Sequence, residues 1–220
     1  MLSEKLKKLT ARPVCKICFK DIKGDSLLSF FNPEVKVCSA CFKSLNYHFS
    51  FGTFLGHKII SLAEYKEPMS TLLIRYKETL DIELAPVFLS YYAQIIGLIF
   101  KGYQLVLVPS TPSKLKKRGF DHLWEMFKFL GLTKLDILSK DETKDQKKKN
   151  ALERKESEKL FHIHEGEKCT GKKILLVDDV ITSGASLSAA VKLIEPMKPK
   201  KIVVLVLMND APLANYSTLN

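Results

Sequence analysis

A hydroxyl-rich loop follows two adjacent aspartates near residue 180, and this pattern could bind a phosphate. Residues 174–187 read ILLVDDVITSGASL, a buried strand that ends in Asp178 and Asp179 and leads through a short loop into a helix. Small residues let backbone N–H groups approach a phosphate, and a helix N-terminus adds partial positive charge. The predicted phosphate-binding residues are Thr182, Ser183, Gly184, Ala185 and Ser186.

The two carboxylates need another partner, because they would repel the phosphate itself. Asp178 and Asp179 make chemical sense if they accept hydrogen bonds from ribose hydroxyls or help to organise a Mg²⁺ shell. The predicted ligand is therefore a sugar phosphate with free hydroxyls. The alternative is a simple capped turn, in which Ser and Thr only satisfy helix N–H groups, but capping does not require two adjacent acids.

Four of the five cysteines form two pairs that could hold a metal ion. Cys15 and Cys18 make one CxxC motif, Cys38 and Cys41 make another, and nineteen residues separate the pairs. Two such turns can close a tetrahedral site of four sulfurs, which suits Zn²⁺, and binding would supply folding energy to a small module. Two disulfides or unpaired thiols are the alternatives. Disulfides are disfavoured because the Lys-rich start lacks the apolar core of a secretory signal. Cys169 receives no role.

A parallel sheet is the architecture that would position the phosphate loop. Apolar runs predict buried strands at 104–108, 173–177 and 201–208, and helical spacing predicts helices at 119–131 and 185–197. A strand–helix–strand order implies parallel strands, and such sheets bind ligands at the carboxyl ends of their strands. The uncharged stretch 84–100 is slightly short for a membrane span, so we expect a buried core helix.

The composition indicates a folded and basic protein. Of its 220 residues 46% are hydrophobic, which excludes disorder over the whole chain, and the formal net charge is +11. This excess favours anionic partners such as phosphates, nucleic acid or an acidic membrane surface, or it gives solubility alone. The basic residues that could contact single-stranded DNA form two clusters, Lys5, Lys7, Lys8, Arg12 and Lys16, and Lys114, Lys116, Lys117 and Arg118.

The phosphate loop resembles the phosphoribosyl diphosphate (PRPP) signature of type I phosphoribosyltransferases. A tetracysteine module followed by such a domain resembles the ComF (ComFC-type) competence family over nearly the whole chain. The other similar positions are Tyr65, Pro68, Lys77, Pro109, Pro112, Leu115 and the triplet Arg118-Gly119-Phe120, with looser agreement at Gln146, Arg154 and Phe161. The sequence departs from the family at Asp121 and His122, where Asn-Gln is usual, and at Leu107, which replaces the first of two prolines.

The resemblance implies a fold and a set of roles. It implies an α/β, parallel-sheet, type I phosphoribosyltransferase-like domain over residues 49–220, after a zinc module with a helical lead-in over residues 1–48. Asp178 and Asp179 would contact the ribose, and residues 182–186 would hold the 5′-phosphate. Ser110 and Thr111 would approach the pyrophosphate, with Lys77 and Arg118 as its charge partners. Mg²⁺ would accompany PRPP, and the charged loop 140–160 could close over the site.

Three functions stay open at this point. The first is a cytoplasmic competence protein for DNA uptake that binds Mg–PRPP and handles incoming single-stranded DNA. Its candidate partners are a DNA-translocation motor or uptake machinery at the inner face of the membrane. The second is an active phosphoribosyltransferase with a nucleobase or amine acceptor. The third is a non-catalytic, PRPP-responsive adaptor whose zinc module docks a partner; fold alone does not choose among them.

Overall fold

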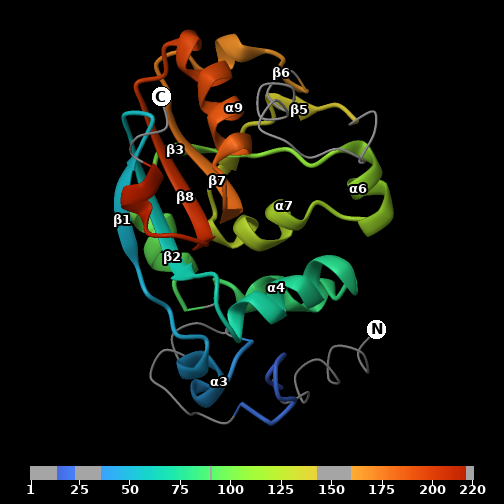
Figure 1. Cartoon of the computed structure of the whole chain (residues 1–220). Coiled ribbons are helices and arrows are strands. Elements are labelled where there is room, and N and C mark those ends of the chain that lie inside the picture. Colours follow the sequence, from blue (N-terminus) through green and yellow to red (C-terminus); the bar gives the residue numbers. More distant parts are fainter. Residues whose placement is uncertain (1–13, 23–35, 90, 143–159, 217–220) are drawn as a thin grey trace, which may run out of the picture.

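The computed structural model describes residues 14–22, 36–89, 91–142 and 160–216, and a six-stranded sheet forms its centre (Figure 1). The strand order is β1-β2-β8-β7-β3-β4, in which β1 and β2 are antiparallel and the other neighbours are parallel. The bounds are β1 Ser50–Phe54, β2 His57–Glu64, β3 Tyr103–Leu107, β4 Thr133–Lys134, β7 Lys173–Ile181 and β8 Lys201–Asn209. A separate antiparallel pair consists of β5 (Leu138–Lys140) and β6 (Phe161–Ile163).

The three central strands confirm the apolar runs read from the sequence. Eight of the nine residues of β8 are buried, as expected for a parallel strand covered on both faces. β7 runs further than predicted and ends at Ile181, so Asp178 and Asp179 lie within the strand rather than after it. The hydroxyl-rich loop therefore occupies residues 182–184, between β7 and the next helix.

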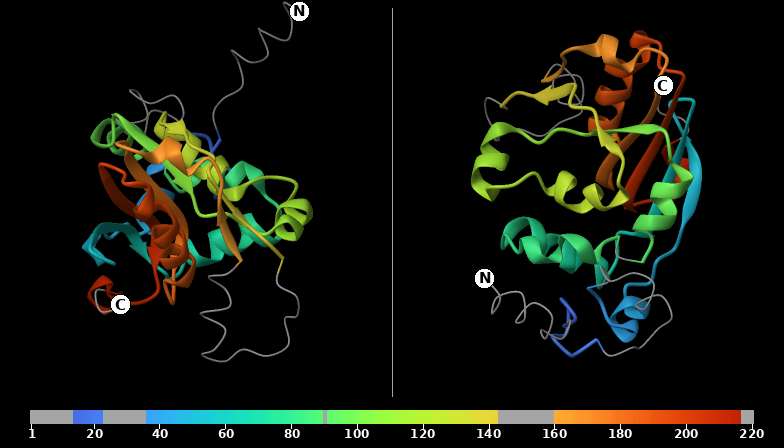
Figure 2. Two further views of the ribbon diagram at one scale, coloured as in Figure 1. Left: turned by 90° about the horizontal axis from the view of Figure 1, so that it is seen from above. Right: turned by 180° about the vertical axis from the view of Figure 1, so that it is seen from behind.

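Helices α4 (Met69–Glu78), α6 (Pro112–Arg118) and α7 (His122–Phe127) lie together to one side of the sheet (Figure 2). The helix predicted at 119–131 is shorter than expected, because Gly119 adopts a left-handed conformation with φ 76° that ends α6. α7 begins only after Asp121, whose carboxylate accepts from the backbone N–H groups of Leu123 and Trp124. The helix predicted at 185–197 is α9 (Ala185–Ile194).

Short 3-10 turns complete the described elements. They are η1 Ile82–Val87, η2 Lys128–Leu130, η3 Gly166–Cys169, η4 Glu195–Met197 and η5 Leu213–Tyr216. Two of them extend helices, since η2 continues α7 and η4 continues α9.

The prediction of one buried helix over 84–100 is wrong. The stretch divides into η1 and α5 (Ala93–Ile99), and Pro86 lies inside η1. Proline lacks the N–H donor that a continuing α-helix needs, which explains the break. α5 also has an exposed apolar face, on which Leu98 is 72% exposed. Within the described ranges, no helix is both long and apolar enough to cross a membrane.

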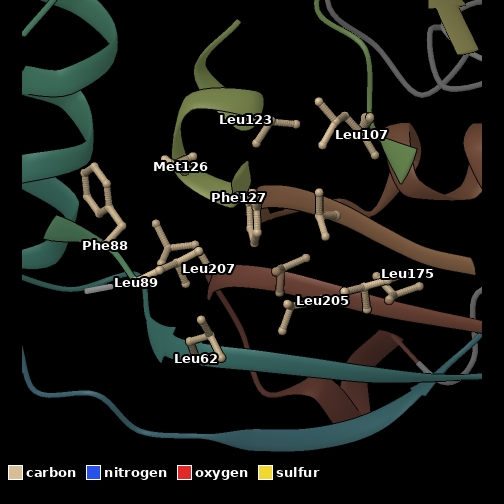
Figure 3. Packing of buried hydrophobic residues seen from close by; sticks show 14 of the residues in the cluster. Leu62, Phe88, Leu89, Leu107, Leu123, Met126, Phe127, Leu175, Leu205 and Leu207 are labelled. Carbon is tan, nitrogen blue, oxygen red and sulfur yellow. The ribbon is translucent and has the colours of Figure 1, made fainter. Parts of the chain in front are cut away.

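The core fixes α7 against the sheet (Figure 3). Leu123 and Phe127 of α7 are fully buried, and α7 packs against β7. Phe88, which follows η1, is also fully buried. Burying such side chains stabilises the fold by about 1.5–3 kcal/mol each. This packing holds the first residue of α7, His122, near the carboxyl end of β7.

The cysteine region packs against the segment that follows η1. It includes α3 (Ser39–Ser44), which Figure 1 shows beyond α4 from the sheet. The ring of Phe42 lies 3.9 Å from that of Tyr91, measured between centroids. The Tyr47 hydroxyl donates to the carbonyl of Phe88 at 2.8 Å, and the Tyr91 hydroxyl donates to Val37 at 3.1 Å. The stretch expected to be plain core therefore joins the cysteine region to the sheet.

Candidate functional site

Asp179 is the centre of a buried polar network at the carboxyl end of β7. Its Oδ2 accepts a hydrogen bond from Lys77 Nζ at 2.7 Å and lies 2.7 Å from His122 Nε2. Asp179 is 6% exposed, and the Lys77 side chain is 24% exposed. Because α4, α7 and β7 each supply one of these residues, three elements converge on a single carboxylate oxygen.

The two aspartates have opposite electrostatic environments. Burial alone would raise the pKa of Asp179, but the hydrogen bond from His122 and the charge of Lys77 hold it well below its usual range. Burial, together with the negative charge of Asp179, raises the pKa of Asp178 to about 8. At neutral pH, Asp179 is ionised and Asp178 is largely protonated. Only one of the two carboxyl groups therefore carries a negative charge that would repel a phosphate.

The hydroxyl-rich loop lies where the sequence placed it, between a buried strand and a helix N-terminus. Thr182 and Ser183 are exposed, and Gly184 has φ 73°, a left-handed conformation that glycine adopts without strain. The Ser183 hydroxyl accepts from the backbone N–H of Ala185 at 3.4 Å. Ser186 lies in the first turn of α9. The geometry fits a phosphate loop, and the phosphate itself stays a prediction.

A pocket of about 370 Å³ opens beside the loop and the buried network. It brings together Lys77, Asp179 and Thr182 from the sequence-predicted set. The other lining residues are Tyr65, Leu73, Ile74, Glu78, Val180 and Asp210. Ser110 and Thr111 follow β3, which neighbours β7 in the sheet, and they do not line this pocket.

An acidic side chain bonds to the start of α6, next to the loop after β3. Thr111 is 7% exposed and precedes α6, and its hydroxyl lies 3.2 Å from that of Ser113. The Glu142 carboxylate accepts hydrogen bonds from the Ser113 backbone N–H and, at 2.8 Å, from its hydroxyl. An anionic side chain of the protein itself thus bonds to the first turn of α6, next to the loop. The charged loop 140–160 lies mostly outside the described residues, as do Gln146 and Arg154.

Arg118 does not contact Asp179, although the sequence grouped it with Lys77. Its Nη1 lies 3.0 Å from His122 Nδ1, so Arg118 reaches Asp179 only through the imidazole. His122 was noted in the sequence merely as a departure from a family pattern. Its partner lies 57 positions away, and no local signal connects the two.

Lys140 is a second residue that the sequence did not single out. It lies in β5, where burial lowers its pKa and its ammonium sits 4.5 Å from the centroid of the Phe161 ring. Its charge also lowers the pKa of Asp178, so the two groups are electrostatic neighbours. In the sequence, Lys140 begins a strongly charged stretch. Such stretches are usually exposed to solvent, so its burial was not predicted.

The four paired cysteines lie close enough together to hold one metal ion. Their sulfurs all lie within 4.8 Å of one another, and Cys18 Sγ is 3.8 Å from Cys38 Sγ. Metal–sulfur bonds of about 2.3 Å give tetrahedral edges of about 3.8 Å, whereas a disulfide needs about 2.05 Å. Burial opposes ionisation, but backbone hydrogen bonds lower the pKa of Cys15 to about 7, which favours a thiolate ligand. The residues fit Zn²⁺, with Cys41 supplying the fourth sulfur.

Comparison with known proteins identifies the family. The sequence pattern of the Phosphoribosyl transferase domain matches residues 129–215. Competence protein ComFC of Streptococcus pneumoniae (strain ATCC BAA-255 / R6) is 33% identical over 151 residues, which cover 69% of this chain and 67% of that protein. The chain belongs to the ComFC family. In this ComFC family member, the domain match includes β7, α9 and β8, and thus Asp179 with its hydroxyl-rich loop.

Solved structures show more distant likenesses. A hypoxanthine-guanine phosphoribosyltransferase from Bacillus anthracis has a TM-score of 0.37 and 18% identity, covering 59% of this chain and 68% of that one. A phosphoribosylpyrophosphate synthetase from Mycobacterium smegmatis has a TM-score of 0.34 and 14% identity, covering 59% and 35%. Membership of the ComFC family rests on the sequence match.

Proposed function

We propose that this ComFC family member binds Mg²⁺–PRPP at the carboxyl end of β7 and handles incoming single-stranded DNA during natural transformation. The observation that carries the proposal is the buried, ionised Asp179 beside an exposed hydroxyl-rich loop. The ribose hydroxyls would donate to Asp179, and the 5′-phosphate would accept from loop residues 182–184 and from the first turn of α9. Protonated Asp178 would add a donor without adding negative charge.

The pyrophosphate would approach the loop after β3. Ser110 and Thr111 lie there, and Lys77 and Arg118 are the charge partners that the family resemblance suggests. When bound, Mg²⁺ neutralises charge on the diphosphate. Oxygen ligands suit this ion, and the ionised carboxylate of Asp179 is the oxygen ligand that the strand end offers. Asp178 would join it if Mg²⁺ displaced the proton of its carboxyl. The Lys77 ammonium, which donates to Asp179, would then also contact the incoming anion.

Helix α6 is the proposed contact surface for single-stranded DNA. Lys114, Lys116 and Lys117 are exposed on it, and Lys117 Nζ lies 3.3 Å from Glu78 Oε2. Phosphate contacts of this kind bind without sequence preference and weaken with salt. Of the N-terminal basic cluster, only Lys16 is described, and it pairs with Glu83 at 2.5 Å. We place this activity in the cytoplasm, with a translocation motor or the membrane uptake machinery as partner.

A second candidate function is phosphoribosyl transfer to a nucleobase or amine. The pocket beside Asp179 favours it, because about 370 Å³ is enough space for a small-molecule ligand. Release of pyrophosphate from Mg–PRPP, with and without an acceptor pool, separates the two functions. Acceptor-dependent release identifies a transferase, whereas PRPP binding without release identifies a PRPP-responsive adaptor.

A gel-shift series tests the DNA surface. The variant K114A/K116A/K117A is expected to weaken binding of a single-stranded oligonucleotide and to flatten its salt dependence. The matched control K58A/K101A/K172A removes three exposed lysines elsewhere and the same net charge. Equal loss in both variants would show that only net charge matters, and an unshifted oligonucleotide at low salt would contradict DNA binding itself.

A further inference from the structure

We propose that His122 is a positioning residue that couples Asp179 to the basic helix α6 through Arg118. The identities of the two ligands concerned, PRPP and single-stranded DNA, rest on the proposed function. The imidazole has one nitrogen 2.7 Å from Asp179 Oδ2 and the other 3.0 Å from Arg118 Nη1. The ring is therefore a bridge between a carboxylate in the sheet and a cation at the end of α6.

The chemistry of the two partners determines the tautomer of the ring. A guanidinium carries only donors, so Nδ1 of His122 must accept from Arg118. In a neutral imidazole the proton then resides on Nε2, where it is donated to Asp179. Both ends of the ring are satisfied in one arrangement only. A flipped ring would turn carbon atoms toward both partners, and a proton on Nδ1 would face the donors of Arg118.

Burial holds the ring in that arrangement. His122 is 5% exposed, and its backbone carbonyl accepts from the Tyr76 hydroxyl at 2.9 Å. Tyr76 is fully buried and lies in α4, one position before Lys77. The same helix thus supplies the cation on Asp179 and holds the backbone of the residue that donates to Asp179. A shift of the ring requires α4 or α7 to move.

A coupling between two surfaces follows from this bridge. Arg118 is the last residue of α6, whose exposed lysines are proposed to contact DNA, and Gly119 turns the chain back toward α7. A ribose that bonds to Asp179 competes with His122 for the carboxylate. When the imidazole is displaced, its hydrogen bond with Arg118 changes as well. Occupancy of one surface then alters affinity at the other, and linkage requires this effect to be reciprocal.

The bridge depends on an imidazole. A glutamine at position 122 carries both polar atoms at the end of its side chain and has carbon at the δ position, where Nδ1 of His122 meets Arg118. It could still donate to Asp179. His122→Gln therefore separates the two bonds: the contact with Asp179 can persist while the connection to Arg118 is lost.

The first test reads the ring directly and needs no ligand. Long-range ¹H–¹⁵N spectra of the full chain, with His122 assigned by its absence in H122Q, are expected to show the neutral Nε2–H tautomer. Arg118→Met, which removes the donor to Nδ1, is expected to shift that resonance. The Nδ1–H tautomer, an averaged ring, or no response to Arg118→Met would overturn the inference.

The second test measures coupling. Wild-type protein is expected to bind Mg–PRPP with an affinity that changes about fivefold or more when single-stranded DNA is present, and the reverse by the same factor. H122Q is expected to lose the coupling while binding PRPP better than H122A. Coupling that persists in H122Q would overturn the inference. Failure of either ligand to bind wild-type protein contradicts the proposed function instead, and the spectra then decide the role of His122.

Discussion

Lys77 Nζ and Asp179 Oδ2 lie 2.7 Å apart, and they join helix α4 to the carboxyl end of β7 across 102 positions of sequence. The carboxylate is nearly buried, whereas the ammonium remains a quarter exposed. The pair therefore combines a structural tie with a cation that can still reach an incoming anion. Its position beside the hydroxyl-rich loop makes it the feature on which stability and proposed ligand binding both depend.

Removing the ammonium is expected to destabilise the fold. Lys77→Met keeps the length of the side chain but leaves Asp179 with one fewer partner. We expect a loss of about 1–3 kcal/mol in the free energy of unfolding, below the cost for fully buried pairs because Lys77 is partly exposed. The control is Lys66→Met, since Lys66 pairs with Glu64 at 2.5 Å but is 76% exposed. Equal losses in denaturant titrations of both variants would contradict the role of burial.

The pH dependence of stability reports on Asp178. Folding raises the pKa of this carboxyl to about 8 from about 4 in the unfolded state. Between these two pH values the folded state therefore keeps a proton that the unfolded state has already released. Its contribution to stability is therefore present at low pH and is lost as the pH rises through about 8. Asp178→Asn is expected to gain stability relative to wild type as the pH rises across that window.

The matched control for this titration is Asp136→Asn, an aspartate whose side chain is 76% exposed. Its stability relative to wild type is expected to stay constant over the same range. Denaturant titrations at several pH values give both differences, and groups common to all variants cancel. A flat difference for Asp178→Asn would show that Asp178 is ionised in the folded protein at neutral pH.

Metal content tests the cysteine site. We expect one zinc ion per chain in wild-type protein and a marked loss in Cys38→Ser, since one of four sulfur ligands is removed. Serine can still cap α3 in place of Cys38, so the change isolates the loss of the ligand. Cys169→Ser is the control, because Cys169 is buried and lies outside the cluster. Elemental analysis and thermal unfolding of both variants supply the readout. Full zinc occupancy with unchanged stability in Cys38→Ser would rule out the site.

Local signals in the sequence predicted the strands and the loop that build the site. The apolar run before Asp178 and the hydroxyls after it are adjacent in the chain. Their order alone predicts a strand that leads into a phosphate loop. The cysteine spacing is similarly local within each pair. In contrast, the bonds of His122 and Lys77 to Asp179 arise only when helices pack on the sheet, and no short-range pattern records them.

Two misjudged elements have specific causes. The hairpin of β1 and β2 was not predicted, because its turn places Leu55 and Gly56 at positive φ of 47° and 78°. Such two-residue turns usually contain Asn-Gly or Asp-Gly, so leucine conceals the signal. The single helix over 84–100 was predicted from its lack of charge, although Pro86 inside it already indicated a break.

The measurement that tests the central claim most directly is calorimetric titration of Mg–PRPP into the full chain. Saturable binding is expected for wild type and for the control Asp136→Asn. Asp179→Asn is expected to bind about tenfold more weakly or worse, because a hydrogen bond to a charged group contributes about 1.5–3 kcal/mol. Absence of binding by wild-type protein, or equal affinity in Asp179→Asn, would contradict the assignment of this strand end as a PRPP site.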